Sequence, residues 1–353
     1  MIELEINPKT LKQHKEWICT TNKNVEKRLY KKLENLSSSE VDPDKKRIFK
    51  FLFSELPNIL IDDLLSLKEI INRYESLMVD FRLKDTEKIK KVRGRSKYNG
   101  KKERILLNDL KIIFENEYKH FYSAKEWNAY MFLEELNLSI CPYCGSQFIF
   151  LYNNGKKTRA TLDHFFDKAT YPFLAISIFN LVPSCKVCNS DLKSTKEFTL
   201  DNNYSPYEKN IVDKIEFSID VESVKKGMKI RNENSEIDYY DMFIGGSTDF
   251  KIKVNYNEND KKIAKKIKGN LETFKLEEFY NKYHKQYVKS IIRKSHIYNK
   301  VYIQALNKSF DLIFIDENDL LKSIYSSVEE DKNNILGKLN REIAKKQLSL
   351  LNS

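Results

Sequence analysis

Two pairs of cysteines constrain this chain more than any other feature of its sequence. Cys141 and Cys144 lie in the segment ICPYCG, and Cys185 and Cys188 lie in SCKVCN. Two intervening residues let both thiolates of a pair face one ion, and two pairs supply the four sulfur ligands of a tetrahedral Zn²⁺ site. Forty residues separate the pairs, so the insert must be a folded unit that returns on itself. We predict a structural zinc ion with no open position for substrate.

The alternatives for the paired cysteines are redox chemistry and incidental placement. In a reducing cytosol, such pairs are more typical of metal ligands than of disulfides. Cys19 has no partner in this pattern and is expected to be a small buried hydrophobic residue. The chain has no apolar run of about 18 residues, and its first residues, MIELEINPKT, do not resemble a secretion signal. We therefore expect no membrane span and a cytoplasmic location.

The charge balance indicates a polyanionic partner, but only weakly. The net charge is +11, and the sequence isoelectric point is about 9.1, which favours nucleic acid. Lys, Asn and Ile are all abundant, however, as the composition of an AT-rich genome would produce. Hydrophobic residues make up 41% and charged residues 32% of the chain, which is typical of a globular protein and excludes a disordered one.

Hydrophobic periodicity predicts an α+β chain that is mainly helical, with a small antiparallel β region after the cysteines. Helical spacing covers most of residues 1–80, with Pro57 as a possible helix start, and returns at 105–138 and from about 260 onward. Alternation at 215–221 and 250–256 predicts two half-buried strands. The predicted regions are an N-terminal helical region at 1–125, a zinc-bound domain at 126–207, a β-rich segment at 208–258 and a C-terminal helical region at 259–353.

Residues 84–104 interrupt the first helical region with a strongly basic stretch. The segment KDTEKIKKVRGRSKYNGKKER contains ten Lys or Arg residues and two glycines, which predicts a loop or linker. One interpretation is a solvated connector. The other is a flexible arm that contacts phosphates, with Arg93, Arg95 and Lys97 as the candidate nucleic-acid contacts.

The segment LDHFFDK between the cysteine pairs carries candidate chemistry. Asp163 and His164 lie on a predicted short strand, and Asn189 directly follows the last cysteine. Carboxylate and carboxamide oxygens are hard donors suited to Mg²⁺, and an imidazole can take a proton from water near neutral pH. The alternatives are a packed core histidine for His164 and a helix cap for Asn189.

The order CPYC, DH, N and CxxCN resembles the zinc-bound branch of the HNH endonucleases, also called ββα-metal nucleases, over roughly residues 139–207. The resemblance implies a ββα-metal core. In that core Asp163 would be the metal-binding carboxylate and His164 the general base. Asn180 matches the middle asparagine that ties down the loop, although it could be only a turn former. Asn189 matches the final metal ligand.

Two basic positions and one departure complete the comparison with that family. Lys193 falls where relatives often place a cation that contacts phosphate, although a solvated lysine is the alternative. Lys168 keeps another basic position of the family. Asp167 stands where relatives often have proline, so the loop is expected to be less rigid.

The resemblance implies a metal-dependent endonuclease that uses Mg²⁺ or Mn²⁺, with DNA favoured and RNA, including tRNA, as an alternative substrate. The flanking regions loosely resemble bacterial HNH proteins of phage-defence loci. This implies an anti-phage or restriction role and a nuclease subunit that an ATPase partner activates. The rival interpretation is a non-catalytic zinc module that binds nucleic acid or protein.

Overall fold

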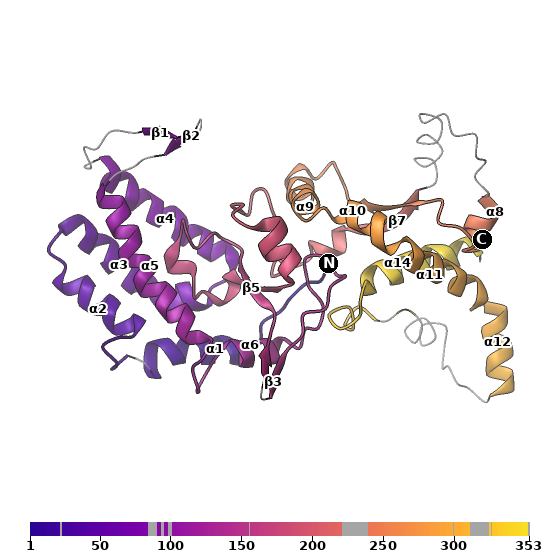
Figure 1. Cartoon of the computed structure of the whole chain (residues 1–353), viewed down its shortest axis with the longest axis horizontal. Coiled ribbons are helices and arrows are strands. Elements are labelled where there is room, and N and C mark those ends of the chain that lie inside the picture. Colours follow the sequence, from indigo (N-terminus) through magenta and orange to yellow (C-terminus); the bar gives the residue numbers. More distant parts are fainter. Residues whose placement is uncertain are drawn as a thin grey trace.

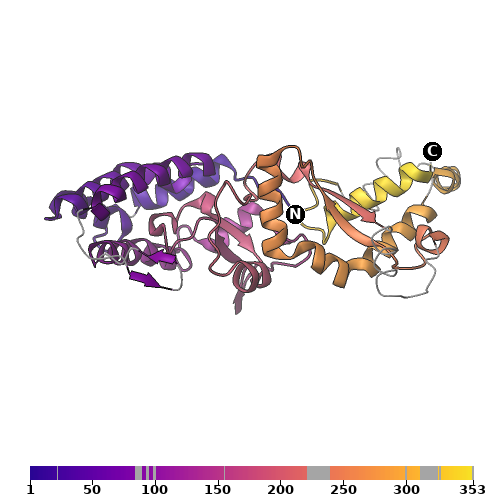
Figure 2. The same ribbon diagram turned by 90° about the horizontal axis from the view of Figure 1, so that it is seen from above.

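The computed structural model shows an elongated molecule with the cysteine-rich unit between two helical ends (Figure 1). The view from above shows the same arrangement (Figure 2). The structure describes residues 1–21, 23–83, 90–92, 95–97, 101–154, 156–220, 239–298, 300–310, 325 and 327–351. Within these residues, helices predominate and the strands form two-stranded antiparallel sheets. The predicted α+β class, mainly helical, is therefore confirmed.

Helices from the first third of the chain pack into one end of the molecule. They are α1 (Pro8–Glu16), η1 (Trp17–Thr21), α2 (Leu29–Ser39), α3 (Pro43–Ile61), α4 (Leu64–Leu83) and α5 (Lys101–Phe121). Helix α3 begins where Asp42 accepts hydrogen bonds from the backbone N–H groups of Asp44 and Lys45. It continues through Pro57, so the prediction that Pro57 marks a helix start is wrong. Pro57 lies close to the end of the helix, and Asp42 and Pro43 supply the start signal.

The basic segment at 84–104 contains regular structure that its composition did not predict. Strand β1 (Lys90–Val92) pairs antiparallel with β2 (Arg95–Lys97), and α5 already begins at Lys101. The loop prediction is therefore wrong for the residues of these two strands and of α5. Arg93 lies outside the described residues, and the side chains of Arg95 and Lys97 are not described either. The proposed phosphate contacts of these residues stay a prediction.

The central unit is a strand–loop–strand–helix arrangement with a small hairpin in front of it. Its elements are α6 (Ala129–Leu136), β3 (Tyr152–Asn154), β4 (Lys156–Thr158), β5 (Thr161–His164), η2 (Pro172–Leu174), η3 (Ile178–Asn180), β6 (Leu181–Ser184) and η4 (Val187–Lys193). Strand β5 pairs antiparallel with β6, with His164 opposite Leu181. The predicted short strand that carries Asp163 and His164 is present as β5, and η4 begins just before Cys188.

The other end of the molecule combines the strand pair β7 and β8 with helices. Its elements are η5 (Val212–Lys214), β7 (Glu216–Asp220), α8 (Tyr239–Phe243), β8 (Lys251–Asn255), α9 (Lys261–Phe274), α10 (Leu276–Phe279), η6 (Tyr280–His284), α11 (Lys285–Ile297), α12 (Lys300–Ser309) and α14 (Gly337–Leu351). The predicted alternation is confirmed for the described residues, because β7 pairs with β8 and Phe217 and Ile252 point into the core. Val221, the last residue of the first predicted strand, lies outside the described residues. Side chains of Asn281 and Glu277 bond the backbone of β8 and so occupy its outer edge.

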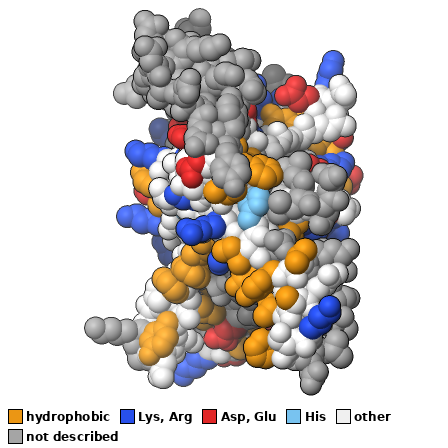
Figure 3. Space-filling model, turned by 90° about the vertical axis from the view of Figure 1, so that its right-hand side faces the viewer, with side chains coloured by type: hydrophobic (Ala, Val, Ile, Leu, Met, Phe, Trp, Pro, Cys, Tyr) orange, Lys and Arg blue, Asp and Glu red, His pale blue; other side chains and the backbone are white. Residues whose placement is uncertain are grey.

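Hydrophobic side chains also reach the surface at this end (Figure 3). They include Ile297 of α11 and Val301 of α12, together with Phe310, which follows α12. None of the described helices combines the length and the apolar character that crossing a bilayer requires.

The central unit is hydrogen-bonded to segments from both ends of the chain. The backbone N–H of Ile2 donates to the carbonyl of Pro142 at 3.0 Å, and the N–H of Leu336 donates to the carbonyl of Gly145 at 2.7 Å. The Tyr280 hydroxyl donates to the carbonyl of Cys144 at 2.6 Å. The segment of the first cysteine pair is therefore held by hydrogen bonds from distant parts of the chain.

His14 of α1 joins the N-terminal helices to the central unit. This buried side chain donates from Nε2 to the carbonyl of Ile176 at 2.8 Å and accepts at Nδ1 from Trp127 Nε1 at 2.9 Å. The Ile176 carbonyl can only accept, so Nε2 carries the proton of a neutral ring. Burial lowers the pKa of His14 to about 4, although the bond to Ile176 acts in the opposite direction.

His14 should make the protein less stable in mild acid. Below its unfolded pKa of about 6.5, the unfolded chain gains a proton that the folded protein excludes down to about pH 4. The free energy of unfolding should therefore fall by up to about 1.4 kcal/mol per pH unit across this window. Urea unfolding at several pH values between 7 and 5 would measure this slope. His14→Gln should reduce the slope by the share of His14 and leave the share of His164, whose pKa burial also lowers. An equal slope in that variant would exclude His14 as a cause.

Candidate zinc site and active-site cavity

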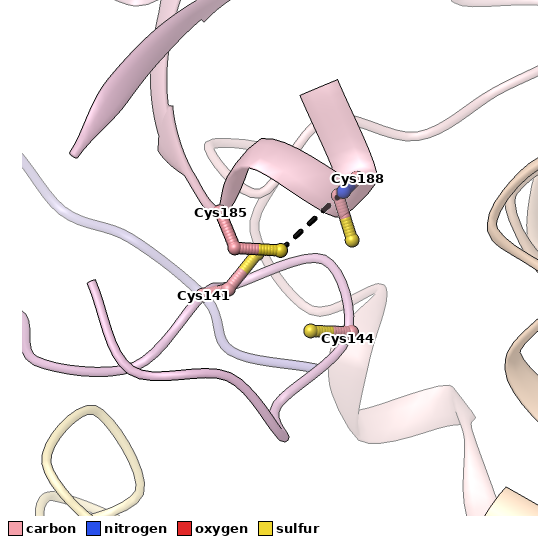
Figure 4. A group of neighbouring side chains, drawn as sticks. All are labelled: Cys141, Cys144, Cys185 and Cys188. Atoms are coloured by element: carbon pink, nitrogen blue, oxygen red, sulfur yellow. Dashed lines mark hydrogen bonds between the residues drawn. The ribbon is translucent and has the colours of Figure 1, made fainter. Parts of the chain in front are cut away.

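The four paired cysteines meet in one buried cluster (Figure 4). The sulfur atoms of Cys141, Cys144, Cys185 and Cys188 all lie within 4.8 Å of one another. Among the described residues, this is the only group of three or more Cys, His, Asp or Glu side chains close enough to share an ion. The cluster is positioned to hold a metal ion, as predicted, and four sulfur donors are compatible with structural zinc.

Local backbone geometry aims both pairs at the same point. After the first pair, the Gly145 N–H donates to the Cys141 carbonyl at 2.8 Å, and Gly145 adopts a φ of 63°, which suits glycine. In the second pair, Cys185 directly follows β6, and the Cys188 N–H lies 3.4 Å from Cys185 Sγ. Burial raises the pKa of the Cys141 thiol well above its usual range. A bound divalent cation would offset the cost of buried thiolates.

A cavity of about 560 Å³ lies beside this cluster. Five residues predicted from the sequence line it, namely Asp163, His164, Lys168, Asn189 and Lys193. They come from β5, from the loop after β5 and from η4, so the antiparallel pairing of β5 with β6 brings them together. The site residue Asn180 does not line the cavity.

Asn180 instead holds the loop between the two strands. Its Oδ1 accepts from the Phe166 N–H at 2.7 Å, and its Nδ2 donates to the carbonyls of Phe166 and Leu174. It is fully buried, which is the loop-binding position that the resemblance implies. Asp167 also fixes this loop, because its carboxylate accepts from the backbone of Ala169 and Thr170. The expected loss of rigidity at Asp167 is therefore offset by these hydrogen bonds.

Asp163 is only 4% exposed, and both of its carboxylate oxygens accept hydrogen bonds. Oδ1 lies 2.7 Å from Lys193 Nζ, and Oδ2 lies 2.7 Å from the Tyr143 hydroxyl. Lys193 is only 3% exposed and also donates to the His164 carbonyl. The alternative that Lys193 is a solvated lysine is therefore wrong. Tyr143 lies between Cys141 and Cys144 in the sequence, so its side chain directly links the cysteine cluster to Asp163.

His164 has one ring nitrogen committed to the protein. Its Nε2 lies 3.1 Å from the carbonyl of Ala175. Because a carbonyl only accepts, the neutral ring carries its proton on Nε2 and keeps a lone pair on Nδ1. Burial lowers the pKa of His164 to about 3, and the charges of Lys168 and Lys193 act in the same direction. The side chain is thus packed like a core histidine, yet it lines the cavity in the neutral form that a general base requires.

Asn189 is partly buried on η4 and lines the same cavity. Its backbone N–H donates to the Cys185 carbonyl at 3.0 Å, so the second cysteine pair sets its position. Its side chain makes no hydrogen bond within the described part of the chain, and the carboxamide oxygen is therefore available to a ligand. The alternative role of Asn189 as a helix cap would use that oxygen, and the described contacts do not include such a bond.

The cavity is strongly basic, and part of this charge was missed by sequence reasoning. Its lining contains five basic side chains and two carboxylates, namely Lys157, Arg159, Lys168, Lys193 and Lys196 with Asp163 and Asp167. The Arg159 guanidinium lies 3.9 Å from the centroid of the Tyr122 ring, which holds it in place. The sequence offered one indication of a role for Arg159, namely its position shortly before the predicted strand, but Arg159 belongs to no recognisable motif. Tyr143 lies within the CPYC motif, but nothing in the sequence predicted its contact with Asp163.

Comparisons with known proteins add no relative, since neither a family model nor a curated protein nor a solved structure matches this chain.

Proposed function

We propose that this protein is a metal-dependent nuclease of the HNH type that hydrolyses phosphodiester bonds in nucleic acid. The observation that supports this most is the meeting of Asp163, His164 and Asn189 at one cavity beside the cysteine cluster. The lining carries a formal excess of three positive charges, which suits a polyanionic substrate. DNA is favoured by the sequence resemblance, and RNA is the alternative.

The proposed catalytic cation is Mg²⁺ or Mn²⁺, and the donor chemistry of the cavity fits it. Asp163 and Asn189 would supply one carboxylate and one carboxamide oxygen, and Mg²⁺ commonly keeps several waters beside so few protein ligands. The Asp163 oxygens already accept from Tyr143 and Lys193, but each oxygen has a second lone pair. Lys193 also offsets the charge of Asp163, so we expect weak binding of the ion.

The residues of the cavity would divide the reaction between them. Lys168 and Arg159 attract the phosphate, and neutral His164 accepts a proton from water at Nδ1 while Ala175 holds Nε2–H. The activated water attacks phosphorus, the bond to the 3′ oxygen breaks, and that oxygen takes a proton from solvent water, which gives 5′-phosphate and 3′-hydroxyl ends as the resemblance implies. When bound, the cation would stabilise negative charge on the phosphate and the departing oxygen.

The test is cleavage of plasmid, linear duplex and total RNA by the purified chain at controlled concentrations of free Mg²⁺ or Mn²⁺. Brief treatment with EDTA should stop cleavage while zinc content and circular dichroism stay constant, because thiolate-bound zinc leaves slowly. Added Mg²⁺ should restore the rate in the wild type but not in Asp163→Ala. Asn189→Ala should raise the metal concentration required, whereas the exposed control Asn72→Ala should not. Full cleavage in EDTA would refute the proposed mechanism.

A second candidate is a zinc-bound module that binds nucleic acid without cleaving it. The buried ion pair between Asp163 and Lys193 favours this reading, because it satisfies the carboxylate without any metal. This candidate is supported if the same assay detects binding to nucleic acid and no cleavage under any metal condition. An ATPase partner that activates the nuclease, as in an anti-phage or restriction system, would instead appear as cleavage that requires the added partner.

A further inference from the structure

Three exposed aromatic side chains form a continuous strip after the first cysteine pair. Phe148, Phe150 and Tyr152, here called the aromatic strip, are 48%, 68% and 54% exposed. The residues between them, Ile149 and Leu151, turn inward and pack on the core. This alternation places all three rings on one outward face of an extended segment.

The rings of the aromatic strip are partly ordered before any ligand binds. Phe148 and Phe150 are stacked, with centroids 5.5 Å apart and planes inclined by 16°. A rigid pair of rings loses little conformational entropy on binding, and the outward faces offer flat apolar surface. Contiguous exposed apolar surface of this kind commonly marks an interaction site.

The aromatic strip leads directly to the rim of the cavity. Tyr152 begins β3 and lies opposite Thr158 of β4, and Asn153 lies opposite Lys157. Thr158, Lys157 and the next residue, Arg159, all line the cavity. The hairpin of β3 and β4 stands out from the body of the molecule (Figure 1), and through Lys157 and Thr158 of β4 it joins the strip to the lining of the cavity.

We propose that the aromatic strip binds unpaired bases of a nucleic-acid strand whose phosphates enter the basic cavity. The proposal rests on the proposed function and narrows its substrate to nucleic acid with a single-stranded stretch. A duplex keeps its bases stacked inside, whereas an unpaired base can stack on an aromatic ring. Charge complementarity favours this occupant over a protein, because the strip adjoins the excess of basic side chains around the cavity.

The test compares binding of three labelled probes by fluorescence anisotropy in a His164→Ala background, which prevents cleavage. The probes are a short oligodeoxythymidylate, an abasic oligonucleotide of equal length and a duplex. The double variant Phe148→Ala/Phe150→Ala should bind the oligodeoxythymidylate at least about tenfold more weakly. Its affinity for the abasic probe should not change, because the phosphate contacts remain.

Two controls keep the result specific. Phe310→Ala removes an exposed phenylalanine outside the strip and should leave all three affinities unchanged. Phe148→Tyr/Phe150→Tyr keeps the rings and should bind like the background protein. Zinc content and circular dichroism of each variant would show that the fold is intact.

The proposal is overturned if the background protein binds the abasic probe as tightly as the oligodeoxythymidylate, or if the double variant binds both as the background does. A strip that joins two copies of the chain would instead appear in sedimentation as self-association lost in the double variant, which also overturns the proposal. Since binding is measured without cleavage, base-dependent binding with no nuclease activity would refute only the proposed function. Cleavage with no base-dependent binding would refute only this inference.

Discussion

Replacing Cys141 or Cys185 with serine is expected to unfold the central unit and to abolish binding of the structural zinc ion that the four-cysteine cluster is positioned to hold. Binding of structural zinc by four thiolates contributes about 10–16 kcal/mol in small zinc domains, which is comparable to the whole stability of a typical domain. Circular dichroism and elemental analysis on the same samples would measure both effects. The matched control is Cys19→Ser, because Cys19 lies outside the cluster and should affect neither. A folded wild-type protein without zinc would contradict the assignment.

His164→Ala is expected to lower the rate of cleavage by about 10²–10⁴-fold, the usual contribution of a general base. The loss of the hydrogen bond to Ala175 should cost only about 1 kcal/mol of stability. Cleavage rates under single-turnover conditions and thermal unfolding would separate these two effects.

His164→Gln distinguishes a base from a packing residue. A glutamine side chain can donate a hydrogen bond but cannot accept the proton of water as an imidazole does, so this variant should stay inactive. The control His120→Ala changes a histidine of α5 that stacks on Trp17 and should leave the rate unchanged. If His164→Gln cleaves at the rate of the wild-type protein, His164 has a packing role and is not the general base.

The local elements around the cavity could be predicted from the sequence because each leaves a local pattern. Cysteine spacing predicted the cluster, and the apolar and polar alternation predicted β7 and β8. The strand that carries Asp163 and His164 was also expected from the sequence. These patterns depend on neighbours within a few residues, and such neighbours are visible in the sequence.

The contacts that set the chemistry of the cavity could not be predicted in this way. Lys193 pairs with Asp163 because η4 folds back under β5, and no local pattern records that approach. The same holds for Tyr143, whose hydroxyl reaches Asp163 from between two cysteines. The density of charge in residues 84–104 likewise predicted a loop where the chain forms a hairpin, since a basic hairpin and a basic loop can have the same composition.

The backbone contacts of the first cysteine pair bear on how the molecule unfolds. Residues near Ile2, Tyr280 and Leu336 all bond to the segment from Pro142 to Gly145. Loss of the metal would therefore release segments near both ends of the chain together with the central unit. We expect cooperative melting on chelation, in which hydrogen exchange of α14 and of the first residues rises in step with that of β5. A zinc ion at this one site would thus stabilise segments along the whole length of an elongated molecule (Figure 1).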